Sequence, residues 1–178
     1  MSHLKFQLLP ASHTGIDFEN NLQHSEEVNA YTFRNFYNGA GVGIGDFNND
    51  GLSDIFFCGN QVDNKLYLNR GDFSFVDVTS SAGVASNNVW STGVSLVDIN
   101  ADGWLDIYVS KSGDIKGENR HNELFINQGA SEEIEGLPTI KFVESSKTYG
   151  LDDIGLSTHA AFLAVSYTHL TLPTTPYV

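Results

Sequence analysis

Two short segments share one chemical pattern, with oxygen-bearing side chains at their first, third, fifth and ninth positions. The first segment begins at Asp46 and the second at Asp98, 52 residues later. A glycine, Gly51 or Gly103, follows the fifth position and allows a sharp turn that a Cβ would hinder. Hard divalent cations need several converging oxygens of this kind. The eight side chains are Asp46, Asn48, Asp50, Asp54, Asp98, Asn100, Asp102 and Asp106.

Each loop can add a backbone oxygen at its seventh position, which is Leu52 in the first loop and Trp104 in the second. Each loop holds three carboxylates, so its formal charge of −3 suits a divalent ion. A mixed set of carboxylate, amide and carbonyl oxygens with a high coordination number favours Ca²⁺ over Mg²⁺. The spacing therefore predicts two calcium sites.

The same opening occurs in EF-hand and dockerin loops, which need an acidic residue at position 12 and adjoining helices. Position 12 is Phe57 in the first loop and Val109 in the second, both within apolar, strand-forming runs. Both families are therefore disfavoured. An acidic turn that holds no ion remains the alternative to a calcium site.

Strand-forming runs recur in the same order around the two loops. In the first unit they are residues 41–47, 54–60, 65–69 and 73–79; in the second, 91–98, 106–110, 122–127 and 141–146, followed by 149–151. The second unit carries two polar, loop-like insertions, Gly113–His121 and Ala130–Thr139. Glycines and β-branched residues interrupt every candidate helix. A repeated four-stranded unit of this length is typical of a propeller blade. The predicted fold is all-β: a partial β-propeller of about two four-stranded blades and the start of a third.

The repeat also predicts the organisation of the chain. Residues after 162 contain neither glycine nor an acidic residue, and Ala164 stands where a third loop would need its first aspartate. That tail resembles translated sequencing-adapter read-through, with a divergent natural terminus as the alternative. The expected segments are a lead-in with at most one strand (1–38), blade-like repeats (39–90 and 91–155), the start of a third repeat (156–162) and a non-native or divergent tail (163–178).

Composition excludes several classes of function. The 178 residues carry a net charge of −13, which disfavours nucleic acid and anionic membranes as partners. No apolar run is long enough to span a membrane, and no signal peptide is visible, as in a cytosolic protein or a chain with an incomplete N-terminus. The single cysteine, Cys58, excludes an internal disulfide framework, and its apolar neighbours predict burial.

Other motifs have simpler interpretations. The tripeptide Arg70–Asp72 spells an integrin-binding motif, but its glycine fits a hairpin turn between two strand-forming runs. Trp90 and Trp104 are expected to pack rather than to form a sugar platform. The six histidines lack zinc spacing, and His159 has no oxyanion hole or nucleophile elbow near it in the sequence. We predict no catalytic residues.

The segments GVGIGDFNNDGLSD and VDINADGWLD, with KLYLNRGD and STGVSLVDINADGWLDIYV, resemble the FG-GAP/VCBS repeat family. The resemblance covers about residues 14–162 and is strongest to the bacterial branch related to cartilage acidic protein. It implies a seven-bladed propeller akin to the integrin α head, with Ca²⁺ in loops between strands, and a secreted or surface location. The ten ligand positions implied are the eight side chains above and the carbonyls of Leu52 and Trp104.

The resemblance also implies a function. We expect an N-terminal fragment of an extracellular propeller, completed by further blades, that binds a protein or glycan partner and uses Ca²⁺ structurally. The alternative is the propeller portion of an extracellular, polysaccharide-processing enzyme. A purely structural spacer is a third interpretation.

Overall fold

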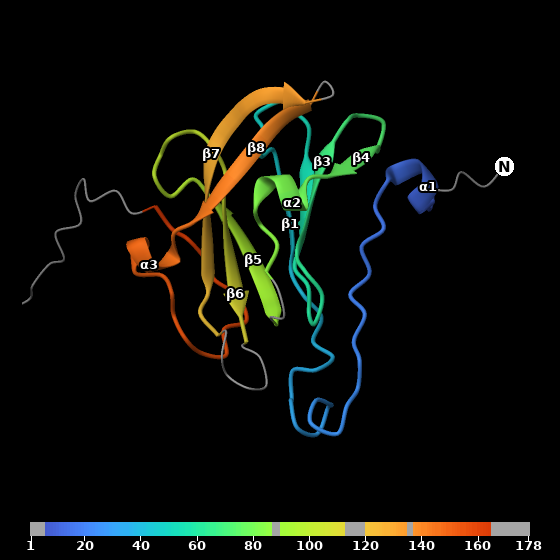
Figure 1. Cartoon of the computed structure of the whole chain (residues 1–178), viewed down its shortest axis with the longest axis vertical. Helices are drawn as coiled ribbons and strands as arrows, with labels where there is room; N and C mark the ends of the chain where they lie inside the picture. Colours follow the sequence, from blue (N-terminus) through green and yellow to red (C-terminus); the bar gives the residue numbers. More distant parts are fainter. Residues whose placement is uncertain (1–5, 87–89, 113–119, 135–136, 165–178) are drawn as a thin grey trace, which may run out of the picture.

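Two four-stranded antiparallel sheets dominate the computed structural model, which describes residues 6–86, 90–112, 120–134 and 137–164 (Figure 1). Within each sheet the strands lie in chain order, as in a propeller blade. This confirms the predicted all-β fold with two four-stranded units. The first sheet contains β1 (Val42–Gly45), β2 (Asp54–Phe57), β3 (Lys65–Asn69) and β4 (Phe75–Asp77). The second contains β5 (Ser91–Val97), β6 (Asp106–Lys111), β7 (Glu123–Ile134) and β8 (Leu137–Glu144).

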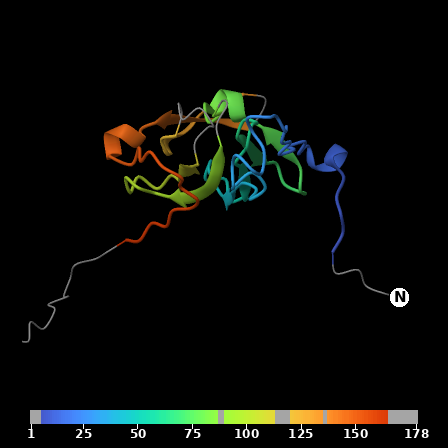
Figure 2. The same cartoon turned by 90° about the horizontal axis from the view of Figure 1, so that it is seen from below.

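The two sheets bury one apolar core between them. Side chains alternate across a strand, so each sheet can turn one set of large residues toward its neighbour. The first sheet contributes Phe56, Leu66 and Leu68, and the second contributes Ile107 and Val109 among others. Figure 2 shows the N-terminal segment outside the first sheet and the chain after β8 outside the second. The core is therefore shared by the two repeats.

Small residues bring the sheets together along β5. A Cβ on Gly41 would lie 2.7 Å from the Val94 backbone nitrogen, and one on Gly93 would lie 2.4 Å from the Thr158 carbonyl oxygen. The Ser91 N–H donates to the Gly59 carbonyl (3.1 Å). The Ser157 N–H donates to the Lys111 carbonyl (3.0 Å) in the same way. The chain after residue 155 thus meets the second sheet as β5 meets the first.

Among the described residues three short helices form, where the sequence predicted none. They are α1 (Ala11–Thr14), α2 (Thr79–Ala82) and α3 (Ser146–Tyr149). The last two follow β4 and β8 at equivalent places, and each ends at a glycine with positive φ, Gly83 (74°) or Gly150 (67°). Residues 149–151, which follow the last strand-forming run of the second unit, therefore close a helical turn. Residues 6–38 contain α1 and no strand.

The insertion Ala130–Thr139 is not a loop, contrary to the prediction. The described part of it extends the β7–β8 hairpin, with Ala130 paired to Ile140 and Ser131 paired to Thr139. A polar sequence indicated a loop, but backbone pairing tolerates polar side chains where a hairpin projects beyond the core. Of the other expectations, residues 113–119 of the first insertion and residues 165–178 of the tail lie outside the described residues.

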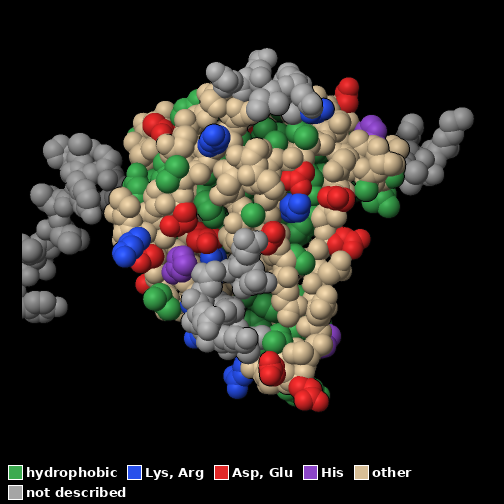
Figure 3. Space-filling model, viewed as in Figure 1, with side chains coloured by type: hydrophobic (Ala, Val, Ile, Leu, Met, Phe, Trp, Pro, Cys, Tyr) green, Lys and Arg blue, Asp and Glu red, His purple; other side chains and the backbone are tan. Residues whose placement is uncertain are grey.

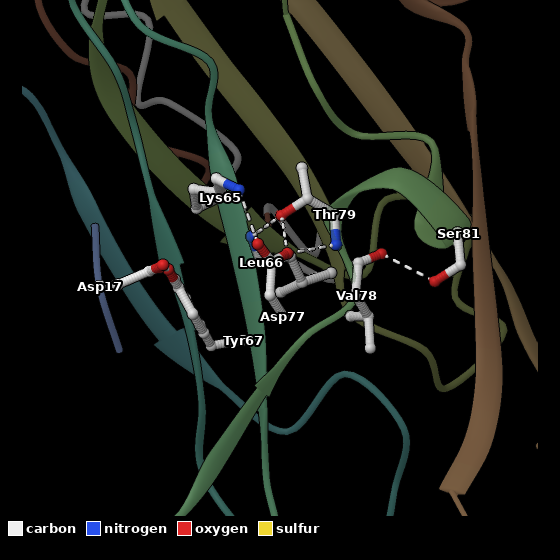
Figure 4. A network of polar contacts seen from close by, with 8 residues as sticks. All are labelled: Asp17, Lys65, Leu66, Tyr67, Asp77, Val78, Thr79 and Ser81. Atoms are coloured by element: carbon white, nitrogen blue, oxygen red, sulfur yellow. Dashed lines mark hydrogen bonds and ion pairs between the residues drawn. The ribbon is translucent and has the colours of Figure 1, made fainter. Parts of the chain in front are cut away.

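Polar contacts fasten the outer strands of the first sheet to α2 (Figure 4). Thr79 Oγ1 accepts the Leu66 N–H (2.9 Å), and Asp77 Oδ1 accepts the Thr79 N–H (2.9 Å). Lys65 Nζ lies 2.6 Å from Asp77 Oδ2. Tyr67 donates its hydroxyl to Asp17 (2.7 Å), which ties the N-terminal segment to β3.

Three simpler sequence interpretations are confirmed. Cys58 is buried, with 1% of its surface exposed. Arg70–Asp72 lies in the turn between β3 and β4, where Gly71 has a φ of 87°. Trp90 is buried and packs on Phe33 and Phe36.

No helix among the described residues has the length and apolarity to cross a membrane.

Candidate metal centre

The first predicted loop folds its side chains inward onto its own backbone. The Asp50 N–H donates to both Asp46 Oδ1 (3.1 Å) and Asn48 Oδ1 (3.2 Å). The Gly51 N–H donates to Asp46 Oδ2 (2.8 Å). Asp50 Oδ1 accepts the Leu52 N–H (2.8 Å), while its Oδ2 accepts the Asn48 amide (2.9 Å). The first, third and fifth positions of the motif are thereby held around one turn.

The second loop repeats this network bond for bond. The Asp102 N–H donates to Asp98 Oδ1 (3.0 Å) and Asn100 Oδ1 (3.1 Å), and the Gly103 N–H donates to Asp98 Oδ2 (2.9 Å). Asp102 accepts the Trp104 N–H (2.9 Å) and the Asn100 amide (2.8 Å). Gly51 and Gly103 have φ values of 85° and 87°, which explains the glycine in each loop. Identical spacing has produced identical geometry.

The aspartate at the ninth position of each motif lies outside the turn and accepts hydrogen bonds from the backbone of its sheet. Asp54 is fully buried at the start of β2, where it accepts the N–H groups of Phe47 (2.9 Å) and Asn69 (2.8 Å). Asp106 is fully buried at the start of β6 and accepts those of Ile99 (3.0 Å) and Asn127 (2.8 Å). Each carboxylate thus joins its loop to the third strand of its sheet. Each oxygen that accepts one N–H keeps a lone pair that could face an ion.

Asn69 and Asn127 support these aspartates and were not predicted. The Asn69 side chain donates to the Ser53 carbonyl (2.8 Å) and accepts the Gly71 N–H (2.8 Å). Asn127 does the same with Leu105 (3.1 Å) and Gly129 (3.0 Å). Both residues end the matching runs KLYLN and ELFIN. That shared asparagine is the signal that could have identified them.

The two loops lie next to each other but are unequally covered. The Asn49 side chain of the first loop donates to the Gly103 carbonyl of the second (3.1 Å). Asn48 is only 5% exposed, whereas its counterpart Asn100 is exposed. The seventh position differs in the opposite sense, since Leu52 is 37% exposed and Trp104 is half-buried against Gly129. The second loop is therefore more open at its third position and more covered at its seventh.

Negative charge accumulates around each ninth-position aspartate. Burial raises the pKa of Asp54 to about 6 against the two N–H bonds that lower it, and the charges of Asp50 and Asp46 add to the rise. Burial likewise raises the pKa of Asp106. Within the described residues, the two Lys–carboxylate ion pairs are Lys65–Asp77 and Lys111–Glu123, neither in a loop. On the face shown in Figure 3, Asp and Glu side chains are spread over much of the surface.

The donor chemistry of each loop fits a hard divalent cation, although the side chains are not arranged around one. In the described part of the chain, no three His, Cys, Asp or Glu side chains are grouped closely enough to hold a metal. The motif has only two carboxylates in its turn, and they bond to backbone N–H groups instead. The residues fit by oxygen type, by uncompensated charge and by their shared turn.

The region of the two loops also matches a known protein family. A model for an FG-GAP-like repeat matches residues 46–109, a span that starts at the first motif and includes the whole of the second. Residues 46–109 form an FG-GAP-like repeat. The matched span begins just before β2 and ends within β6, so it includes strands of both sheets.

Three curated proteins are similar in sequence to part of this chain. Cartilage acidic protein 1 of Xenopus tropicalis is 38% identical over 93 residues, which cover 52% of this chain and 14% of the relative. The human protein is 44% identical over 69 residues (39% of this chain, 10% of the relative), and the mouse protein is 41% identical over 69 residues (39% and 11%). The matched region is thus about a seventh or less of each relative's length.

Proposed function

We propose that this chain is a calcium-stabilised propeller module that serves as an extracellular binding or adhesion scaffold. The observation that carries the proposal is the bond-for-bond repetition of the two acidic turns. Two loops that share the same five hydrogen bonds and a positive-φ glycine indicate a common requirement that one acidic turn alone would not. The FG-GAP-like repeat supports the same proposal.

In this proposal each ion is held by the inward-facing oxygens of one turn. Asp46, Asn48 and Asp50 supply side-chain oxygens in the first loop, and Leu52 supplies its carbonyl. Asp98, Asn100, Asp102 and Trp104 do so in the second. A bound Ca²⁺ contributes positive charge that relieves repulsion among the loop carboxylates. Asp54 and Asp106 are proposed to face the ion from the strand side while holding the loop to the sheet.

The role of calcium is then structural. The two loops touch through Asn49 and Gly103, and they lie at the same end of adjacent sheets. An ion in each would fix how one repeat sits against the next. The remaining blades of a full propeller and a protein or glycan ligand are the partners proposed.

Calorimetry tests the proposal directly. After chelation, the chain is titrated with Ca²⁺ and, separately, with Mg²⁺. We expect two Ca²⁺ per chain with dissociation constants of about 10⁻⁴–10⁻³ M, the range of extracellular modules. Asp50→Ala should remove one site and leave the other. At free Ca²⁺ about 100-fold above the dissociation constant, each site should add about 2.7 kcal/mol to the free energy of unfolding.

Two outcomes would contradict the proposal. Absence of heat with Ca²⁺, together with equal melting temperatures in Ca²⁺ and chelator, would leave the loops as acidic turns. Preference for Mg²⁺ would overturn the choice of metal. Asp72→Ala is the matched control, because Asp72 lies in the β3–β4 turn outside both loops.

A further inference from the structure

Two of the chain's three arginines line one pocket at the end of the sheets opposite the acidic loops. The pocket has a volume of about 460 Å³ and is lined by Thr32, Phe33, Arg34, Asn35, Ser112, Arg120 and Leu156. In the second sheet the acidic loop connects β5 to β6, whereas Ser112 and Arg120 lie between β6 and β7. Antiparallel strands place these two connections at opposite ends. The pocket is therefore separate from the candidate metal centre.

This concentration of cations is unusual for the chain. Only nine Lys and Arg residues stand against 22 acidic ones. Within the described residues, the ion pairs involve Lys65 and Lys111, and neither Arg34 nor Arg120 has a side-chain partner. The Nε atom of Arg120 is buried and unpaired. A buried guanidinium donor without an acceptor is costly, so an acceptor from outside the described chain would stabilise it.

Neighbouring groups add polar and aromatic character to the pocket. Phe33 and Leu156 form the apolar part of the lining, and Phe33 is held edge-on against the buried Trp90 at 4.7 Å between ring centroids. The Ser112 hydroxyl donates to the Ser157 carbonyl (3.1 Å), which leaves its oxygen free to accept. Unpaired N–H donors beside an apolar wall match a small molecule with one anionic end.

We propose that this pocket binds an oxyanion, with a carboxylate on a small polar molecule such as an acidic sugar as its ligand class. The planar fork of a guanidinium matches the two oxygens of a carboxylate, and two arginines can bind it from two sides. Arg34 from the N-terminal segment and Arg120 from the second repeat are the recognition residues. The proposal deepens the binding role above by naming a ligand class, and it rests on that role.

Nuclear magnetic resonance titration of the full chain in Ca²⁺ tests this. The probes are glucuronate, uncharged glucose, inorganic sulfate and inorganic phosphate. Glucuronate should produce saturable shifts in the amides of residues 32–35 and of Ser112 and Arg120, while glucose should produce none. Arg34→Gln and Arg120→Gln should each weaken binding by about tenfold or more, the equivalent of one charged hydrogen bond.

Arg70→Gln is the matched control, since Arg70 lies in the β3–β4 turn, and it should bind glucuronate as the unaltered chain does. Melting temperatures confirm that each variant is folded. Equal shifts with glucose, or unchanged affinity in both pocket variants, would overturn the proposal. Saturable binding of sulfate or phosphate without glucuronate would overturn the choice of a carboxylate. Failure of calcium binding with glucuronate binding intact would count against the calcium role alone.

Discussion

A buried ion pair at the junction of the two repeats provides the sharpest test of the packing. Lys111 Nζ lies 2.6 Å from Glu123 Oε1, with side-chain exposures of 0% and 12%. The contact joins a fully buried ammonium to a nearly buried carboxylate, so each charge depends on the other for compensation. Ser86 donates its hydroxyl to the other Glu123 oxygen, and Asn64 donates to Ser86 (3.1 Å). The pair thus joins the β2–β3 connection to the second sheet.

Removing the Lys111 ammonium should lower the free energy of unfolding far more than removing a lysine at the surface. Lys111→Met leaves the Glu123 carboxylate buried without its counter-charge, and we expect a loss of about 3–5 kcal/mol in the free energy of unfolding. Lys65→Met is the matched control, because Lys65 and Asp77 are 36% and 35% exposed. Solvent screens that pair, so its loss should cost about 0–1 kcal/mol.

Urea denaturation in Ca²⁺, followed by tryptophan fluorescence, measures both losses. The double variant Lys111→Met with Glu123→Gln should recover part of the stability lost by the single variant, because the unpaired charge is gone. Equal effects of Lys111→Met and Lys65→Met would refute the reasoning. So would a double variant less stable than Lys111→Met alone.

Three further predictions concern the core, the outer strands and the contact between sheets. Burial raises the pKa of Cys58 to about 12, so the native thiol should resist alkylation at pH 8 and react once urea unfolds the chain; rapid native labelling would contradict its burial. Burial alone would raise the pKa of Asp77, but hydrogen bonds from Lys65 and from the side chain and N–H of Thr79 lower it below the ordinary aspartate value of 3.8. The contribution of Asp77 to stability is therefore present above pH 3.8 and is lost as the pH falls below it. Asp77→Asn should reduce the loss of unfolding free energy below pH 3.8. An unchanged dependence of stability on pH in that range would exclude this role for Asp77. Gly41→Ala should cost about 1–3 kcal/mol, because its Cβ would meet backbone of β5, while Gly155→Ala, with open space around it, should be neutral in the same melting assay.

The repeat and its loops could be predicted because they depend on local chemistry. Turn glycines and alternating oxygens determine a loop within a few residues, and Gly51 and Gly103 adopt the positive φ that their positions required. Alternating apolar runs likewise predicted eight strands in the correct order. The errors were also local. The helical turns α2 and α3 were missed, and the polar extension of the β7–β8 hairpin was taken for a loop.

Long-range packing decided the rest, because it depends on which surfaces meet. Nothing in the motif distinguishes the buried Asn48 from the exposed Asn100, and the difference is seen only in the folded chain. Arg34 and Arg120 are distant in the chain and share a pocket only because the N-terminal segment crosses the end of the sheets. The sequence by itself determined the fold class and the oxygen-rich turns. Only the tertiary structure shows that Asp54 and Asp106 join each loop to a strand. They accept the N–H groups of Asn69 and Asn127, which come close to them only when the sheets form.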